Sequence, residues 1–533
     1  MNACQFYLSL HRHQMKRIVV LIIVLLAAII SMAYLYFSGL EADYKNNDQA
    51  LYSATARSAF IFSFQNDKRI FDILKDQPLL SEVIGEKMAI QADALYQYFL
   101  SIPGVSQSVS GQNTYICLLP GSDKKIKILY TTQINNRYSE DQFESALKSS
   151  RLNAERWGRY LKFKLPDSSI YYCSVHNKLL LLSIDSNLIE NASAAGSEKS
   201  NKFADYIAGN SKLQKNTLAE VYINFSDLPE LLKMVIPGKL IGGLSVLDQQ
   251  HGYATLVYNY SAEKILLTGT TRINDEDNYL LLFNSLRPVK TTITNLLPHN
   301  TANFTAYAIE NYATWRGPFG NWLKENREGR QVASRLTLIT NKYRIDPELI
   351  FPKYFKDQLI YFQLSTGEKL GAINLSNGEK LQQLLLDLSN SYSDDIRIFK
   401  EPDLLFAYFG DAFKDFQKPY YVIKDNCLVF ANNASTIQSF LNSYLNNKLL
   451  INERDYMSSV NQLPNSASIT YYIGFKNSSG IFLKNIYLPY YRHLTDRAGM
   501  KNYSSFFYQL SSERGKFQTN ILLNKKDSLL TLP

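Results

Sequence analysis

The chain has 533 residues, too many for one ordinary hydrophobic core, because single domains usually run to ~100–200 residues. Hydrophobic residues make up 46% of the chain and charged residues 20%, which excludes wholesale disorder and predicts folded domains. The net charge of +9 is spread thinly over 57 basic and 48 acidic residues, so we expect no nucleic-acid partner.

The first predicted element is a transmembrane helix over residues 18–37, a segment without a charge. At a rise of about 1.5 Å per residue, a helix of this length spans a bilayer's hydrocarbon layer. Lys16 and Arg17 precede the segment and Glu41 follows it, so the positive-inside rule keeps residues 1–17 in the cytoplasm. No convincing cleavage site of small residues follows, which favours an uncleaved signal anchor over a cleaved signal peptide. The rest of the chain, beginning with a linker over residues 38–52, is then expected on the other side of the membrane.

Four cysteines are present, and the anchor separates Cys4 from Cys117, Cys173 and Cys427. Three cysteines cannot all pair, and domains of this size do not need disulfides to fold. A bridge between Cys117 and Cys173 remains open, but buried free thiols are the prediction.

Hairpins and short helices follow along the chain. Residues 171–184 predict two strands around a turn at 176–178, and Ser186 predicts the N-cap of a following helix. Residues 220–226 predict a strand that leads into a short helix, and residues 253–274 a hairpin that turns near 261–263. This irregular alternation favours an α+β fold with largely antiparallel sheets over a parallel βαβ array.

The same pattern occurs twice. Residues 171–192 align with residues 420–441 at an offset of 249, which matches Tyr171 with Tyr420 and Ser186 with Ser435 as a second cap. Residues 220–225 and 253–280 align with later segments at an offset of 250. Looser matches join residues from Tyr115 to those from Tyr361 (offset 246), and residues from Ser58 to those from Thr305 (offset 247). A spacing this long and this constant indicates two copies of one domain rather than a short-period solenoid.

The boundary between the copies is expected where Pro288 and Pro298 bracket a helix end and a new start. The predicted organisation is therefore the anchor followed by repeat domain 1 (residues 53–290) and repeat domain 2 (residues 291–533). Each copy is expected to be a mixed, largely antiparallel sheet with helices.

The sequence contains no established catalytic motif. Nucleophile elbows, phosphate-binding glycine loops and H-E-x-x-H or C-x-x-C patterns are absent. Cys173 and His176 are the nearest approach to a metal pair, but residues three apart on a strand point to opposite faces. We therefore predict no catalytic, cofactor-binding or metal-binding residues and no cofactor, and whether the protein is an enzyme stays open.

Two segments are candidates for contact loops. Residues 236–247 are apolar and contain Ile236, Leu240 and Leu244, and their counterpart in the second copy, residues 487–503, is aromatic and basic, with Tyr490, Tyr491 and Arg492. Loops diverge in this way when one scaffold is reused for different contacts. The alternative is a short helix that covers the core.

A third candidate lies in residues 312–322, which hold Trp315 and Trp322, two of the three tryptophans. Tryptophan is enriched at interfaces. The alternative is ordinary packing around a Pro–Gly turn.

The anchor, the opening "LLPHNTANFTAYAIENY" of the second copy and the hairpin "YYVIKDNCLVFANN" resemble bacterial envelope proteins that carry a domain of unknown function. The resemblance covers most of the chain after the anchor and brings no catalytic residues with it. It implies a single-pass protein of the inner membrane that faces the periplasm.

Three functions are open on these grounds. The first is a non-enzymatic binding or assembly module of the cell envelope with a protein partner. The second is a carrier of a lipid or another apolar ligand, and the third is an envelope enzyme whose site is assembled from scattered residues.

Overall fold

The structure, a computed structural model, describes residues 48–526 except 122, 196–200, 214–216, 239–246, 248–249, 260 and 326–328. The predicted cytoplasmic tail, the predicted anchor and most of the predicted linker lie outside the described residues. Within the part that is described, no helix combines the length and the hydropathy needed to cross a bilayer.

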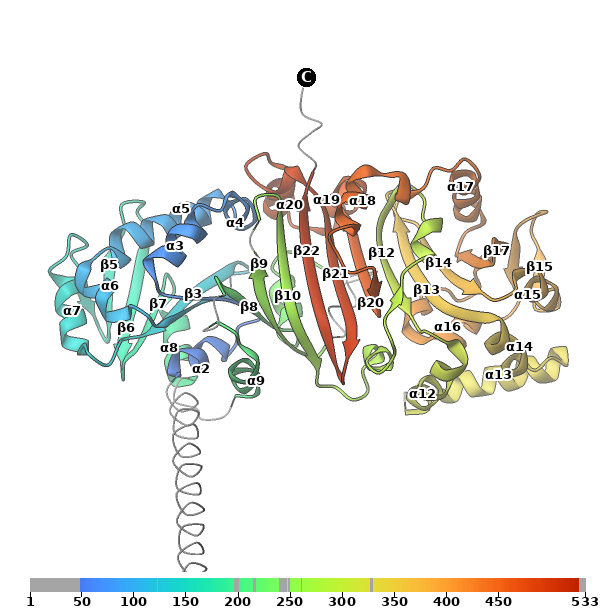
Figure 1. Cartoon of the computed structure of the whole chain (residues 1–533), viewed down its shortest axis with the longest axis horizontal. Helices are drawn as coiled ribbons and strands as arrows, with labels where there is room; N and C mark the ends of the chain where they lie inside the picture. Colours follow the sequence, from blue (N-terminus) through green and yellow to red (C-terminus); the bar gives the residue numbers. More distant parts are fainter. Residues whose placement is uncertain are drawn as a thin grey trace, which may run out of the picture.

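One continuous antiparallel sheet runs through the whole molecule, and the described residues contribute twenty strands to it (Figure 1). Helices lie on both of its faces, so the predicted α+β class with antiparallel pairing is confirmed. The sheet twists along its length, as strand sterics require, and the central strands run nearly vertically in Figure 1 whereas β3 runs across the view.

We call residues 48–290 the first half and residues 291–526 the second half. From the outer edge to the centre, the strands of the first half are β4 (Glu155–Trp157), β5 (Tyr160–Lys164), β6 (Ile170–His176), β7 (Leu179–Ser183), β3 (Ile126–Gln133), β2 (Asn113–Pro120), β1 (Phe60–Gln65), β8 (Glu220–Asn224), β9 (Gly252–Asn259) and β10 (Lys264–Ile273). In the same direction, the strands of the second half are β15 (Ser389–Ser391), β16 (Arg397–Phe399), β17 (Tyr420–Lys424), β18 (Cys427–Ala431), β14 (Lys369–Leu375), β13 (Phe355–Leu364), β12 (Thr301–Ala308), β20 (Ile469–Gly474), β21 (Tyr503–Glu513) and β22 (Lys516–Lys525). A separate two-stranded sheet pairs β11 (Val289–Lys290) with β19 (Ser466–Ala467).

The two halves meet where β10 pairs with β22. The registers of the hairpins β9–β10 and β21–β22 correspond at an offset of 252, and not at the predicted 250, since Asn259 pairs with Leu266 as Ser511 does with Gln518. Thr268 and Asn520, which are 252 positions apart, lie directly opposite each other in the pair of β10 with β22. A local two-fold axis therefore passes between Thr268 and Asn520, and the strand order reads alike outward from it in both directions.

The register of the outer strands corrects the sequence alignment. His176 pairs with Leu179 around a turn, and Lys424 pairs with Cys427 in the same way, so corresponding residues are 248 positions apart and not 249. The reason is the turn itself, because its positive-φ positions are residues 177–178 in one half and 425–426 in the other. Tyr172, and not Tyr171, thus corresponds to Tyr420, and a slip of one residue exchanges the two faces of a strand.

The first strands of each half also correspond at other offsets than predicted. Phe60 is paired with Ile223, and Asn303 with Ile473, which gives 243 in place of 247. Tyr115 reaches the same place as Ile360 through the neighbouring pairs, which gives 245 in place of 246. The alignment found the corresponding strands but not their register.

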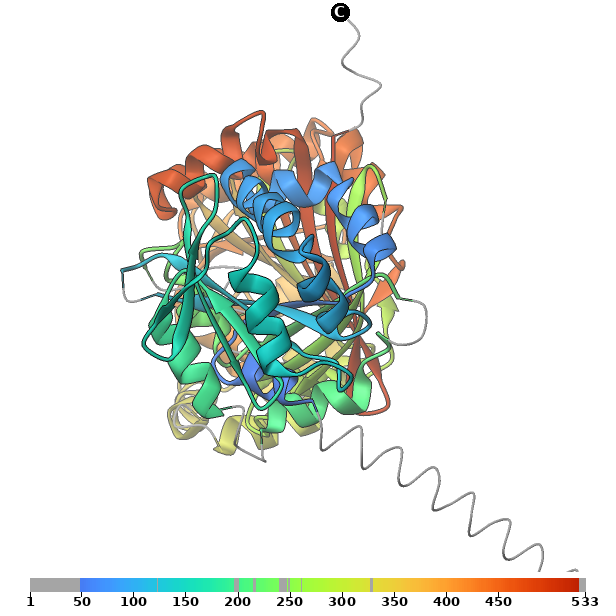
Figure 2. The same cartoon turned by 90° about the vertical axis from the view of Figure 1, so that its left-hand side faces the viewer.

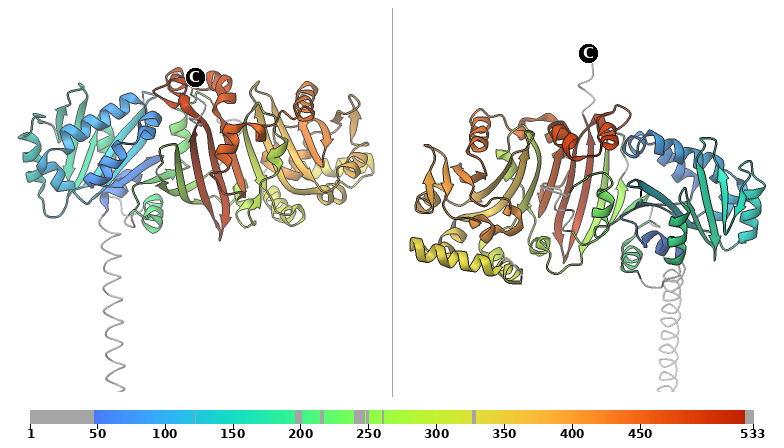
Figure 3. Two further views of the ribbon diagram at one scale, coloured as in Figure 1. Left: turned by 45° about the horizontal axis from the view of Figure 1, so that its top comes forward. Right: turned by 180° about the vertical axis from the view of Figure 1, so that it is seen from behind.

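Most helices fill equivalent connections in the two halves (Figures 1 and 3). In the first half they are α2 (Gln49–Thr55), α3 (Lys68–Lys75), α4 (Pro78–Ile84), α5 (Glu86–Leu95), the π-helix η1 (Tyr96–Leu100), α6 (Pro103–Val109), α7 (Glu140–Lys148), α8 (Ser186–Ala195), α9 (Lys202–Asn210) and α10 (Leu228–Leu232). Two short 3₁₀ helices flank the boundary of the halves, η3 (Tyr279–Phe283) at the end of the first and η4 (Ile293–Leu296) at the start of the second. The second half has α12 (Tyr312–Glu325), α13 (Gly329–Tyr343), α14 (Pro347–Tyr354), α15 (Gly378–Leu384), α16 (Leu404–Phe409), η5 (Gly410–Phe413), α17 (Ala434–Leu445), η6 (Leu450–Asn452), α18 (Arg454–Val460), α19 (Phe475–Asn485), α20 (Leu488–Thr495) and η7 (Met500–Asn502).

The predicted hairpins at 171–184 and 253–274 are confirmed as β6–β7 and β9–β10. The predicted helix caps are wrong by one and two residues, because Ser186 is already the first residue of α8 and Asn433 is the N-cap of α17. In α8 the carboxylate of Asp185 accepts the Asn187 N–H at 3.1 Å and so satisfies a free donor of the first turn. The predicted linker also ends too late, since α2 begins at Gln49 and buries Ala50 and Leu51 against the sheet.

Both buried cysteines of the first half are free thiols. Cys117 packs with Leu51 and Ile189 beneath α2 and α8, whereas Cys173 packs with Phe143 of α7 in a separate core. Because β7 sends alternate leucines into these two cores, they lie on opposite faces of the sheet. Burial raises the pKa of the Cys117 thiol to about 12, so this thiol is unreactive at neutral pH.

Candidate binding surface

Helices α19 and α20 lie on the side of the molecule opposite α2, the first helix of the described chain (Figures 1 and 2). Although they belong to the second half, they touch the first. The Tyr487 N–H donates to the carbonyl oxygen of Val235 at 2.9 Å, and His493 Nε2 lies 3.1 Å from the carbonyl oxygen of Val83. The two helices therefore cover the junction between the halves.

This surface exposes large apolar side chains. Leu483 at the end of α19 is 57% exposed and Leu488 at the start of α20 is 51% exposed, with Tyr487 between them also exposed. Ile84 of α4, next to Val83, is exposed as well. Aromatic and aliphatic side chains displayed together in this way are typical of a protein-binding surface.

Basic side chains surround the apolar ones. Between residues 475 and 502 the exposed charged side chains comprise five basic residues and a single acid: Lys476, Lys484, Arg492, Arg497, Lys501 and Asp496. Such a surface repels cationic partners and attracts acidic ones over about a Debye length. We call Leu483, Tyr487, Leu488, Lys484 and Arg492 the α19–α20 surface.

The start of the first predicted contact loop lies next to the start of the second. Residues 236 and 487 were expected at equivalent places in two separate copies, whereas the hydrogen bond from Tyr487 to Val235 joins Tyr487 to the residue directly before Ile236. Ile236 is half-buried, and Leu240 and Leu244 lie outside the described residues. Of the residues predicted in α20, Arg492 is exposed, whereas Tyr490 and Tyr491 are half-buried. The most exposed apolar residues, Leu483 and Leu488, were not predicted.

The predicted tryptophan surface is instead core. Trp315 is fully buried and stacks on Phe319 with ring centroids 4.6 Å apart, and Trp322 donates its indole N–H to the Asp277 carbonyl at 2.7 Å. The segment is helix α12 and not a Pro–Gly turn, with Pro318 inside the helix. A proline there removes one backbone donor, and burial of the aromatic face of α12 offsets this loss.

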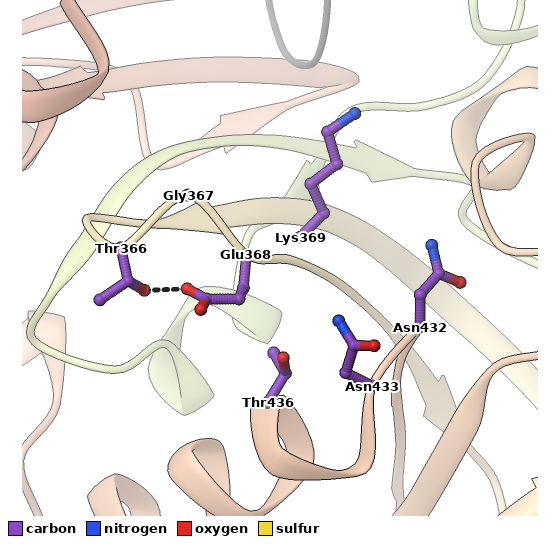
Figure 4. A pocket seen from close by; sticks show the side chains of 7 residues that line it. All are labelled: Thr366, Gly367, Glu368, Lys369, Asn432, Asn433 and Thr436. Carbon is purple, nitrogen blue, oxygen red and sulfur yellow. Dashed lines mark hydrogen bonds between the residues drawn. The ribbon is translucent and has the colours of Figure 1, made fainter. Parts of the chain in front are cut away.

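A shallow polar hollow of about 390 Å³ lies in the second half (Figure 4). It is formed by the turn between β13 and β14 and by the first turn of α17: Thr366, Gly367, Glu368, Lys369, Asn432, Asn433 and Thr436. Thr366 donates to the carboxylate of Glu368, and Lys369 is held by Asp415 at 2.7 Å. No sequence motif indicated this hollow.

Acidic and phenolic groups are buried together in the first half. Glu220 accepts hydrogen bonds from the Tyr222 hydroxyl at 2.7 Å, the Ser211 hydroxyl at 2.6 Å and the Lys212 N–H at 2.7 Å. Nearby, Tyr115 donates to Asp48 at 2.6 Å. Burial raises the pKa of the Asp48 carboxyl, and the hydrogen bond from Tyr115 opposes this effect. Burial also raises the pKa of the Tyr222 phenol far above its usual value.

This cluster has no equivalent in the second half. Glu220 corresponds to Thr470 and Tyr115 to Ile360, although Tyr222 corresponds to Tyr472. The cluster holds α2 and the end of α9 to the sheet, and its carboxylates are engaged by neighbouring groups. We read it as a structural network.

No group of three or more metal-ligating side chains gathers among the residues that are described. Cys173 is buried and His176 is exposed, as expected for residues on opposite faces of β6.

Comparison with known proteins gives no relationship for this chain. No family model matches it, no curated protein is significantly similar in sequence, and no solved structure is significantly similar in fold. The function must therefore be argued from the residues and the geometry described above.

Proposed function

We propose that the protein is a non-enzymatic binding or assembly module of the cell envelope, tethered to the inner membrane by residues 18–37 and facing the periplasm. It carries two copies of one sheet-and-helix unit, fused through β10 and β22. Its partner is an acidic envelope protein that binds the α19–α20 surface. The observation that carries this proposal is the cluster of exposed apolar and basic side chains on that surface.

The matched strand order supports the duplication. Ten strands in one half have ten counterparts in the other, and the connecting helices fall in the same places except for α16 and η5, which have no counterpart between β5 and β6. Joining the copies edge to edge pairs β10 with β22, so neither strand is left as an open edge that would attract other chains.

The position of the α19–α20 surface supports a partner that binds on the side of the protein away from the membrane of the predicted anchor. Residue 48, the first described residue, lies within the predicted linker and leads into α2, and the α19–α20 surface lies on the opposite side (Figure 2). A tether that leaves from the α2 side turns the α19–α20 surface toward the periplasm. A soluble or separately anchored protein can then reach it.

The aromatic interior gives no support to a carrier of apolar ligands. Its rings contact one another closely, as Tyr312 and Phe355 do with centroids 5.2 Å apart and Phe355 and Phe409 with centroids 4.6 Å apart. Contacts of this kind are those of a packed core.

The test is site-specific photocrosslinking in native membranes, with a photoreactive amino acid placed at Leu488 in the full-length protein. The matched control is the same residue at Leu445 of α17, which is also an exposed leucine. We expect a light-dependent adduct with one protein at position 488 and not at 445. That protein, once purified, should bind the full-length chain about tenfold more weakly when Lys484 and Arg492 are both replaced by Glu, since rim charges steer acidic partners.

Adducts with lipid alone would contradict the proposal. So would a protein adduct that forms equally at both positions, or binding that does not respond to the charge reversal.

A further inference from the structure

Both ends of the long sheet display an exposed aromatic side chain that rests on a tyrosine. In the second half, Tyr392 is 61% exposed and its ring centroid lies 5.2 Å from that of Tyr420. In the first half, Trp157 is 49% exposed and its centroid lies 5.1 Å from that of Tyr172. Figure 1 places the outer strands of the two halves at opposite ends of the molecule.

The two pairs occupy corresponding positions. Tyr172 pairs with Lys162, which pairs with Glu155, and Trp157 follows Glu155 by two residues. On the other side Tyr420 pairs with Ile398, which pairs with Asn390, and Tyr392 follows Asn390 by two residues. The same steps across the sheet therefore lead from each tyrosine to its exposed aromatic partner.

The aromatic pairs correspond although the connections between the neighbouring strands differ. β5 and β6 are joined by a short turn at residues 165–169, whereas β16 and β17 are separated by α16 and η5. If the halves are copies, as the proposed function has it, these connections have diverged while the exposed aromatic pair is present in both. Core packing gives no reason to keep a side chain that is half or more exposed, whereas a ligand does.

The polar hollow adjoins the pair in the second half. Tyr420 pairs with Ala431, the residue directly before Asn432, and Ala431 also pairs with Leu370, directly after Lys369. Neighbouring strands are about 4.8 Å apart, so the ring of Tyr420 lies within one or two strands of the hollow.

One hydroxyl group that lines the hollow has no hydrogen-bond partner among the described residues. Thr436 is only 4% exposed, lines the hollow, and its hydroxyl makes no hydrogen bond within the described residues (Figure 4). Thr436 is in the first turn of α17, whose N-cap residue Asn433 makes no side-chain cap. The free N–H groups of that turn add further donors toward the hollow.

The chemistry of the hollow selects a neutral, hydroxyl-rich ligand. It offers donors and acceptors together, from the amides of Asn432 and Asn433, the hydroxyl of Thr436 and the carboxylate of Glu368. Asp415 compensates the charge of Lys369, so Glu368 makes the site unfavourable for an anion. Sugars match both parts of the site, because hydroxyls can donate and accept while polarised C–H groups can lie on an aromatic face.

We propose that Tyr392, Tyr420 and the adjoining hollow form a binding site for a neutral saccharide unit, and that Trp157 with Tyr172 forms a second, simpler site in the first half. The two sites give a tethered protein a way to hold envelope polysaccharide. This proposal is distinct from that for the α19–α20 surface, and neither test depends on the result of the other.

The test measures binding of soluble neutral hexasaccharides (chitohexaose, cellohexaose and maltohexaose) to the purified full-length protein in detergent, by saturation-transfer NMR and calorimetry. We expect at least one of them to bind, with Tyr392→Ala weakening the affinity about tenfold, the effect of losing about 1.4 kcal/mol of stacking and burial. Tyr392→Phe should retain binding because it keeps the ring. Thr436→Val, which preserves shape and removes the hydroxyl, should weaken binding about three- to tenfold.

The control is Leu349→Ala on α14, an exposed leucine away from the aromatic pairs, which should leave the affinity unchanged. Trp157→Ala should halve the number of sites without changing the affinity of the other site. The proposal is overturned if none of the three saccharides binds, if binding is unaffected by Tyr392→Ala, or if Tyr392→Ala and Leu349→Ala weaken it equally. Capture of a peptide strand by β15 in place of the saccharides would also overturn it.

Discussion

Tyr222 and Tyr472 show how one residue type serves two purposes at corresponding places. Both are buried, and both lie 250 positions apart on β8 and β20. Tyr222 donates its hydroxyl to Glu220, whereas the hydroxyl of Tyr472 makes no hydrogen bond within the described part of the chain and its ring packs 4.8 Å from that of Phe507. In the first half the hydroxyl is part of a polar network, and in the second half the ring alone does the packing.

We therefore expect Tyr222→Phe to lower the free energy of unfolding by about 1–3 kcal/mol, because it leaves a buried carboxylate short of a donor. Tyr472→Phe is the matched control and should change it by less than about 1 kcal/mol. Urea unfolding of the full-length protein, followed by circular dichroism, measures both. Equal losses in the two variants would show that the network of Glu220 contributes nothing beyond packing.

At the scale of elements, the hairpins and their turns are what the sequence predicts best. Alternating apolar residues around Asn177 and around Asn426 indicate β6–β7 and β17–β18 without any tertiary information. Their relative register cannot be read in this way, because matching Asn177 with Asn426 maximises identity while the turn geometry matches Asn177 with Asp425. Only the pairing of neighbouring strands decides between the two.

For the binding residues too, the sequence predicts the element but only some of the exposed side chains. The position of α20 as a contact element is visible from its divergent composition, and Arg492 is exposed as expected. Trp157 and Tyr392 were not predicted, because unequal connections place them 15 and 28 residues before their partner tyrosines, so no alignment of the two halves brings them together. For Trp315 and Trp322 the packing alternative is confirmed and the contact surface is wrong, but the Pro–Gly turn expected around them is a helix.

Gly269 of β10 lies where the hairpin β9–β10 meets the junction. A Cβ built there would lie 2.0 Å from the carbonyl oxygen of Thr255 in β9, a contact that the strand cannot relieve without moving backbone. Glycine therefore lets β10 lie close to β9 next to its pairing with β22.

We expect Gly269→Ala to destabilise the full-length protein by about 1–3 kcal/mol, as overpacking does. Gly209→Ala in helix α9 is the control, since nothing lies within 4 Å of the added carbon and alanine favours a helix. Thermal unfolding should show a lower midpoint for the first variant and an unchanged or higher one for the second. A Gly269→Ala protein as stable as the wild type would mean that β9 and β10 do not approach as closely as described.

At the scale of the whole molecule, one sheet passes from one half to the other. The pairing of β10 with β22 fixes how α19 and α20 lie against the first half, and it sets the two aromatic pairs at opposite ends of the molecule. In the alternative arrangement, each half would keep its own sheet, and β10 would not pair with β22. The arrangement of the whole molecule therefore depends on the junction.

Disulfide formation across the junction tests this arrangement most directly. Thr270 and Gln518 lie directly opposite each other on β10 and β22, and Val257 and Thr268 do so within the hairpin β9–β10 as a control pair. Opposed residues of antiparallel strands have Cβ atoms about 4.5–5.5 Å apart, close enough for oxidation or a short thiol crosslinker. In the full-length protein we predict that cysteines at 270 and 518 crosslink within one chain as readily as the control pair. Crosslinking of the control pair alone, or of 270 to 518 only between different chains, would contradict the continuous sheet.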